Sequence, residues 1–379
     1  MLEKLRLHNF KCFREASLRL APLTLLTGAN GTGKSSVIQS LLLLRQSYDQ
    51  GLLRGGGLLL DGELLRAGRG IDVLYENADE DFVEIEITQS LGGIARWRFA
   101  YNRNEDVMQL AAGPNWASIQ NANIFGSDFC YLQAERVGPR TAYDTSEHLV
   151  HLKRQLGNDG RYASDFLMKF GSEKLQGVPK MWHPRSTQGD ATTLKEQVEA
   201  WMQEVAPGLR ISCVAQEATD TVSLKYSFAR MGDVSRPYRT TNVGFGITYT
   251  LPIVVALLSS RRGGLLLVEN PEAHLHPRGQ SKIAELICRA AASGLQILME
   301  SHSDHVLNAV RLAVRNEILA PQDVAIHYFG SHAEGTEAQT SIISPKISAD
   351  GRIDNWPAGF FDELDKALGE LILPRENEP

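Results

Sequence analysis

The first part of the chain spaces its hydrophobic residues as strands do, and then as a helix does. Leu5 and Leu7 alternate with polar residues, as in a half-buried strand. Residues 23–27 form a short apolar run that suits a buried strand. A glycine-rich segment follows, and residues 35–46 then repeat apolar side chains at helical spacing. The pattern therefore predicts strand, loop and helix in that order.

The next stretch of the chain predicts more strands. Residues 83–87 alternate strictly, and residues 95–101 can pair with them as a second strand. Residues 129–132 form a short apolar run that ends in the polar, turn-rich residues 134–140. Because α/β proteins bind ligands at the carboxyl ends of their strands, we expect this turn near a site.

The middle of the chain has the weakest pattern. Residues 193–205 predict an amphipathic helix and residues 222–229 a strand, but no long heptad repeat favours a coiled coil. We interpret this stretch as a mixed α+β insertion within an α/β fold that has a β-rich N-terminal lobe and a parallel-stranded core. The expected parts are an N-terminal lobe (1–140), an insertion or lid (141–235), a C-terminal lobe (236–330) and a small extension (331–379).

The composition indicates a class of protein but no particular function. The 379 residues are 43% hydrophobic and 22% charged with a net charge of −6, which is ordinary for a globular protein and unlike a nucleic-acid coat. The longest apolar stretch, residues 251–258, is too short to span a bilayer, and the charged N-terminus does not resemble a signal peptide. We expect a cytoplasmic protein with no membrane contact and with reduced thiols at Cys12, Cys130, Cys213 and Cys288.

The glycine-rich segment is a complete P-loop. It reads Gly28-Ala29-Asn30-Gly31-Thr32-Gly33-Lys34-Ser35, between a predicted strand and a predicted helix. Such a loop turns backbone N–H groups toward phosphate oxygens, while Lys34 reaches the β and γ phosphates and Ser35 offers a hydroxyl to Mg²⁺. The sequence therefore predicts binding of ATP with Mg²⁺.

Two later strands end in residues that suit the same chemistry. Residues 265–268 are apolar and lead to Glu269, whose carboxylate can hold Mg²⁺ opposite the P-loop hydroxyl. Residues 296–299 are also mostly apolar, and His302 follows three residues later, where it can sense the γ-phosphate or the attacking water.

A second glycine-containing turn precedes the acidic strand. Gly244 and Gly246 lie just before a predicted helix at residues 249–258, which creates a second helix N-terminus able to bind an anion. The order is P-loop, glycine turn, acidic strand and histidine, and Lys34 is far from Glu269 along the chain. This order and spacing resemble ABC-type ATPase heads, in which an inserted subdomain separates the two phosphate motifs.

The motifs also resemble one group of these heads. Residues 269–277 (ENPEAHLHP) are similar to the extended acidic motif of the OLD-like and RecF/SMC-related ATPases, and residues 9–13 (NFKCF) to their opening segment. A prokaryotic subgroup with a C-terminal domain of unknown function, often found in anti-phage defence operons, is more similar still. The segments that carry this likeness are residues 131–139, 242–246, 301–308 and 355–362.

The resemblance implies a nucleotide site shared between two subunits. Glu269 would be the acid on the Mg²⁺ side, and His302 the switch histidine. The Gly244–Thr248 turn would be the signature-like loop that meets the γ-phosphate bound by a partner subunit. The residues expected to bind the nucleotide are Lys11, Asn30, Gly31, Thr32, Gly33, Lys34, Ser35, Ser36, Gln133, Gly244, Gly246 and Thr248, with Ser35 and Glu269 as metal ligands.

One position departs from the pattern of ABC heads. The residue after the Mg²⁺-side acid is usually a glutamate that polarises the attacking water, but here it is Asn270. An amide can orient water but cannot accept a proton at neutral pH. Either Glu272 or another group takes over this role, or hydrolysis is slow and ATP acts mainly as a switch. No clear Q-loop is present, and Gln133 is the best candidate for it.

Three functions remain open at this stage. The first is an ATP-gated homodimer or higher oligomer that controls an effector encoded nearby, such as a nuclease or another toxin. The second is a repair-type head that binds DNA, and the third is a nuclease of the OLD kind, for which residues 306–379 offer no convincing acidic cluster. The arginines that could contact DNA phosphates are Arg136, Arg140, Arg154, Arg161, Arg261 and Arg262.

Overall fold

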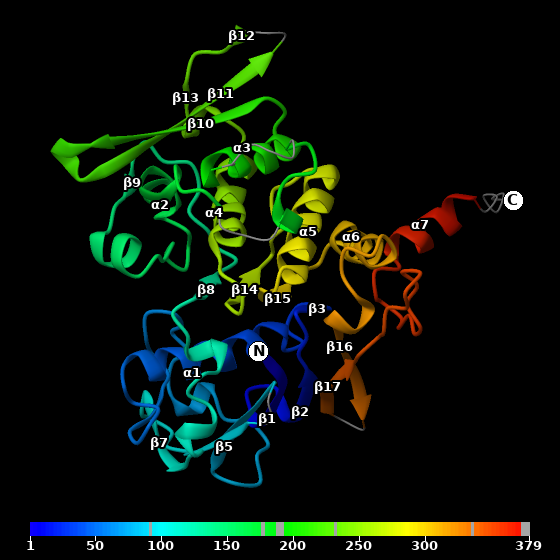
Figure 1. Ribbon diagram of the computed structural model, residues 1–379. Coiled ribbons are helices and arrows are strands. Elements are labelled where there is room, and N and C mark those ends of the chain that lie inside the picture. The colour runs from blue at the N-terminus through cyan, green and yellow to red at the C-terminus, as the bar shows by residue number, and fades with distance from the viewer. Residues whose placement is uncertain (91–92, 176–178, 187–192, 231–232, 335–336, 373–379) are drawn as a thin grey trace, which may run out of the picture.

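The residues that the structure describes form three β-sheets and the helices that cover them (Figure 1). The computed structural model describes residues 1–90, 93–175, 179–186, 193–230, 233–334 and 337–372. Within them, the α/β architecture with a β-rich N-terminal lobe, a parallel core and a mixed insertion is confirmed. None of the helices in these residues combines the length and apolar character needed to cross a bilayer.

The first sheet belongs to the N-terminal lobe and is antiparallel, with the order β2-β1-β5-β6-β7-β4. Leu5 and Leu7 are buried while their polar neighbours face outward, as the alternation predicted. The predicted pairing of residues 83–87 with residues 95–101 is confirmed by the β5–β6 ladder. The strands are β1 (Leu2–Phe10), β2 (Phe13–Arg19), β4 (Gly57–Leu59), β5 (Phe82–Gln89), β6 (Ile94–Ala100) and β7 (Val107–Ala112).

The second sheet is the core of the molecule, with the order β17-β16-β3-β15-β14-β8. Neighbouring strands in this sheet are parallel except for β16 and β17, which form an antiparallel pair at one edge. Because the strands are parallel, their carboxyl ends meet at one edge of the sheet, where ligands bind in such folds. The strands are β3 (Leu23–Gly28), β8 (Phe129–Leu132), β14 (Leu265–Glu269), β15 (Gln296–Glu300), β16 (Val324–Glu334) and β17 (Glu337–Ile343).

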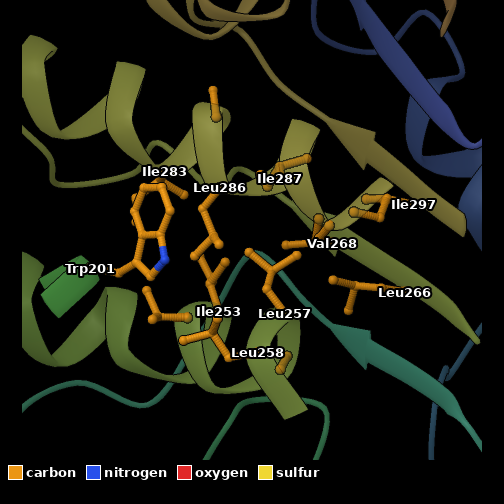
Figure 2. Packing of buried hydrophobic residues seen from close by; sticks show 14 of the residues in the cluster. Trp201, Ile253, Leu257, Leu258, Leu266, Val268, Ile283, Leu286, Ile287 and Ile297 are labelled. Atoms are coloured by element: carbon orange, nitrogen blue, oxygen red, sulfur yellow. The ribbon is translucent and has the colours of Figure 1, made fainter. Parts of the chain in front are cut away.

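Helices cover this sheet and supply most of the buried hydrophobic residues that pack against it. Figure 2 shows Leu257 of α4 and Leu286 of α5 lying between Trp201 of α3 (Leu194–Val205) on one side and Leu266 of β14 on the other. Trp201 is 1% exposed, so its truncation to alanine should cost about 3–5 kcal/mol of folding free energy. The helices here are α1 (Lys34–Asp49), α4 (Phe245–Ser259), α5 (Pro277–Ala292) and α6 (Asp304–Arg315).

The insertion is joined to this core through α3. The helix begins at a capping box in which Thr193 and Glu196 satisfy each other's backbone N–H groups, and it packs against α4 and α5. The third sheet lies beyond it, at the top of Figure 1. The strands of this sheet are β9 (Tyr143–Asp144), β10 (Leu209–Gln216), β11 (Thr221–Arg230), β12 (Asp233–Val234) and β13 (Tyr238–Arg239). The helices of the insertion are α2 (Ala163–Phe170) and α3 (Leu194–Val205).

The C-terminal part is tied to the core sheet. β16 runs across residues 330 and 331, where the C-terminal lobe was expected to end and the extension to begin, and α7 (Glu363–Ile372) ends the described chain. The buried ring of Phe360 packs against the ring of Tyr328 on β16.

Short helical turns also occur along the described chain. They are η1 (Gly70–Asp72), η2 (Trp116–Ser118), η3 (Asn123–Phe125), η4 (Glu147–Leu152), η5 (Pro179–Met181), η6 (Glu217–Thr219), η7 (Thr240–Asn242) and η8 (Pro321–Asp323).

Candidate nucleotide site

The P-loop joins the end of β3 to the start of α1. Gly28 has φ 135°, and a Cβ there would lie 2.1 Å from the carbonyl oxygen of Phe329 on β16. Gly33 caps α1 with φ 100°, and a Cβ there would lie 2.5 Å from Cys12 Sγ. Only glycine fits these two positions without a shift of its neighbours. The loop therefore keeps the backbone conformation that turns N–H groups toward a phosphate.

Lys34 lies deep in this loop. It is 3% exposed, and its Nζ donates a hydrogen bond to the Ala29 carbonyl at 2.6 Å. Burial lowers the pKa of Lys34, and the nearby charge of Glu300 opposes this shift. Thr32 Oγ1 donates to the same carbonyl at 2.8 Å. The ammonium group thus lies on its own loop, within reach of any phosphate that the loop binds.

A cavity of about 250 Å³ opens beside the loop. Lys11 approaches it from the turn after β1, with φ 50°, and its Nζ donates to Gln39 Oε1 at 2.6 Å. This donor set of backbone N–H groups, two lysines and a serine hydroxyl fits a polyphosphate with Mg²⁺. The expected residues that line the cavity are Lys11, Asn30, Gly31, Gly33, Lys34, Ser35 and Ser36.

Glu269 lies at the end of β14, but its carboxylate faces β8 and the residues that follow it. Its Oε1 accepts a hydrogen bond from the Tyr131 hydroxyl at 3.0 Å, and its Oε2 accepts one from the Ala134 N–H at 3.1 Å. Burial raises the pKa of Glu269, and the like charge of Glu300 adds to the shift. Glu269 is not among the residues that line the P-loop cavity.

Glu300, at the end of β15, was not predicted as a site residue. Its Oε2 accepts a hydrogen bond from Ser35 Oγ at 2.9 Å, and its Oε1 lies 3.8 Å from Lys34 Nζ. It lines the P-loop cavity with them. The signal in the sequence is an acidic residue at the end of an apolar strand, two positions before His302.

The remaining predicted catalytic residues lie around one loop. Asn270 adopts a left-handed backbone conformation with φ 44°, and its N–H donates to the Glu300 carbonyl at 2.9 Å. Glu272 Oε1 accepts a hydrogen bond from the His302 N–H at 2.9 Å. The His302 ring lies 3.7 Å from Glu300 Oε1 and borders a separate cavity of about 430 Å³ beside the P-loop. Glu272 thus holds the loop that carries the histidine.

The glycine turn does not reach the P-loop cavity of its own chain. Gly244 is the N-cap of α4 and is exposed, and Phe245 beside it is 45% exposed. Thr248 is 2% exposed, so its side chain packs inside the fold and is not presented to a partner. The helix begins at Phe245, four residues earlier than the pattern predicted, so the whole turn is helical N-terminus.

Arg136 links the end of β14 to the first turns of α4. It is 4% exposed, so the expectation that it contacts DNA phosphates is wrong. Its guanidinium donates to the carbonyls of Glu269 and Asn270 at 2.6 and 2.7 Å and stacks 4.4 Å from the Tyr249 ring of α4. Gln133, the Q-loop candidate, donates to the nearby Glu135 carbonyl and does not line the P-loop cavity.

Comparison with known families supports a nucleotide site. Residues 1–150 match an AAA ATPase domain family. Residues 147–308 match an AAA domain family whose description names the AbiEii toxin of a type IV toxin–antitoxin system. Residues 319–371 match a family of proteins of unknown function, DUF3696.

An individual relative agrees with these matches. An OLD nuclease of Thermus scotoductus is 22% identical over 335 residues, which are 80% of this chain and 59% of that protein. The chain is therefore similar to AAA-type ATPases and to a protein of the OLD group. Since it spans 59% of the length of the OLD nuclease, the activity of that whole protein does not transfer directly to this head.

Solved structures show that the head has the fold of SMC ATPase heads. An SMC head bound to the C-terminal winged-helix domain of ScpA superposes with a TM-score of 0.53 at 14% identity, covering 90% of this chain and 97% of that one. The SMC head of Pyrococcus furiosus, with an extended coiled coil and bound to the C-terminal domain of ScpA, gives a TM-score of 0.52 at 12% identity. It covers 98% of each chain.

Proposed function

We propose that this head binds ATP with Mg²⁺ at its P-loop and closes on a second copy of itself when ATP is present. The observation that supports this most is the incomplete set of groups around the cavity. Ser35 and Lys34 line it, whereas Gly244 and Gly246 do not. A γ-phosphate would therefore lack the signature-like loop unless another copy supplied it.

The start of α4 has the properties that such a contact needs. Gly244 is exposed, no side chain caps the helix, and its first turn contains no acidic residue. Free N–H groups and the positive end of the helix dipole favour an anion at this point. ATP would then join two copies, and its hydrolysis would release them.

We propose further that this cycle controls a partner effector in prokaryotic anti-phage defence. The likeness to an OLD nuclease and to an AbiEii-type AAA family supports an output of this kind. The C-terminal acids favour a partner over a built-in nuclease, because Asp362 pairs with Lys366 at 3.0 Å and Glu363 with the same lysine at 2.8 Å. Plaque counts on cells that carry the gene with and without its neighbour test this output.

The dimer itself is tested by measuring molar mass. Size-exclusion chromatography with light scattering should give one copy without nucleotide and two copies with ATP and Mg²⁺. Glu272→Gln should strengthen the dimer if loss of this acid slows hydrolysis. The same molar mass in every nucleotide state would contradict the proposal.

A further inference from the structure

The order of the central strands places Glu300 closer to the P-loop than Glu269. β15 lies between β3 and β14, so Glu300 pairs with Leu26 on one side and with Glu269 on the other. Neighbouring strands are about 4.8 Å apart. The backbone of Glu300 is therefore one strand away from the P-loop strand, and the backbone of Glu269 is two strands away.

The Glu300 carboxylate contacts both side chains that begin α1. One of its oxygens accepts the hydrogen bond from Ser35 Oγ at 2.9 Å, and the other lies 3.8 Å from Lys34 Nζ. Ser35 is the P-loop residue whose hydroxyl is offered to Mg²⁺. Mg²⁺ favours one or two carboxylates together with phosphate oxygens and water. Glu300 thus lies where a second protein ligand would be needed.

Glu269 has both carboxylate oxygens engaged on the opposite side. The Tyr131 hydroxyl and the Ala134 N–H each donate to one of them, at 3.0 and 3.1 Å. Moving this carboxylate toward Ser35 would leave two donors without their acceptor, one on β8 and one just after it. Such a loss costs more than an ordinary hydrogen bond contributes.

We propose that Glu300 is the acid on the Mg²⁺ side of the nucleotide, and that Glu269 holds β8 and the residues just after it in place. This replaces the expected pair of Ser35 and Glu269 by Ser35 and Glu300. Bound Mg²⁺ would neutralise phosphate charge, while Glu300 orients the Ser35 hydroxyl and Lys34 pairs with the phosphates. The inference rests on the proposed nucleotide binding and not on the proposed dimer.

The test compares Glu300→Gln with Glu269→Gln in the full chain. Each variant keeps the size of the side chain and removes one negative charge. The affinity for a fluorescent ATP analogue is measured with Mg²⁺ and with EDTA. The ratio of the two affinities gives the contribution of Mg²⁺ and requires no hydrolysis.

In Glu300→Gln, the gain in affinity caused by Mg²⁺ should fall by about tenfold relative to the wild type, because the metal loses a charged ligand. Affinity in EDTA should be unchanged or higher, since Lys34 is freed from its ion pair. Glu269→Gln should keep the Mg²⁺ gain. A loss in Glu269→Gln that equals or exceeds the loss in Glu300→Gln overturns the proposal.

Two controls keep the result interpretable. Thermal unfolding shows whether each variant folds, and Glu300→Asp carries the same comparison if Glu300→Gln does not, because its shorter carboxylate is drawn back from Ser35. A wild-type chain that binds the analogue but stays a single copy contradicts the dimer alone. A wild-type chain that binds it in neither condition contradicts both proposals.

Discussion

The glycine-containing starts of α1 and α4 differ in how much of their surroundings the chain supplies. At α1, Gly33 is held against Cys12, and Lys34 is buried beside Glu300. At α4, a Cβ on Gly244 would meet nothing within 4 Å, and Phe245 is exposed. The start of α1 therefore lines a cavity, and the start of α4 lies exposed on the surface.

This difference indicates how one ATP site divides between copies. A buried lysine with an acid beside it binds and orients phosphate within a single chain. An exposed helix start can only act on an anion that another molecule brings to it. Mutations at α1 should therefore affect nucleotide binding, and mutations at the start of α4 should affect association.

The largest effect is expected at the buried start. Lys34→Ala removes the charge that reaches the β and γ phosphates and should weaken ATP binding by about 4 kcal/mol, roughly 1,000-fold. Titration with a fluorescent ATP analogue measures this loss. Lys153→Ala, at an exposed lysine of another segment, is the matched control. Binding within tenfold of the wild type would remove the first half of the comparison.

A mutation at the exposed start of α4 should weaken the association of two copies and leave nucleotide binding unchanged. Gly244→Glu meets open space, so the fold should tolerate it, but its carboxylate repels a γ-phosphate at the helix N-terminus. We expect ATP-dependent dimerisation to weaken by about 3 kcal/mol, roughly 100-fold, with ATP binding by the single copy unchanged. Sedimentation velocity measures the dimer, and Gly244→Ala, which adds no charge, should behave as the wild type does.

Arg136 links the two starts, because it contacts the end of β14 and the Tyr249 ring of α4. Arg136→Ala leaves several buried carbonyls without a donor and should lower the free energy of unfolding by about 2 kcal/mol. Urea denaturation followed by circular dichroism measures the change. The exposed Arg140→Ala should change stability little, and equal effects of the two variants would argue against a buried link.

The smallest effect concerns pH and a buried histidine of β16, the strand next to the P-loop strand. His327 of β16 pairs with Leu26 of β3, and burial lowers the pKa of its ring. The unfolded chain therefore binds a proton more readily than the folded one, so stability is present above the ordinary histidine pKa of about 6.5 and is lost as pH falls below it. His327→Asn should flatten this fall, which is about 1.4 kcal/mol per pH unit at most.

Melting temperatures between pH 5 and pH 7.5 measure the effect. His148→Asn, at an exposed histidine, is the control and should leave the pH profile as it is in the wild type. Identical slopes in the wild type and in His327→Asn would show that this histidine does not link proton binding to folding.

Local elements were readable from the sequence because their signals are local. The apolar run at residues 129–132 is β8 as predicted, and the Thr193–Glu196 capping box marks the start of α3. The P-loop could be placed because its glycines, lysine and flanking pattern lie within one short segment. Strand β7 (Val107–Ala112) was missed, because only one of its six residues, Met108, is buried and leaves little alternation.

The arrangement of the acids could not be read in this way. Glu269 and Glu300 both end apolar strands, and nothing local says which strand lies next to β3. That order depends on how helices α5 and α6 cross the sheet. Likewise, Arg136 looked like one surface arginine among several, because burial of a side chain depends on packing by distant elements.

The most direct test of the divided site is to mix two defective chains. Lys34→Ala retains an intact glycine turn, and Gly244→Glu retains an intact P-loop, so neither forms a complete site with itself. Light scattering with ATP and Mg²⁺ should show single copies in each separate sample and heterodimers in the mixture, with one complete site per pair. If the mixture stays monomeric under conditions in which the wild type dimerises, the site is not divided between P-loop and glycine turn.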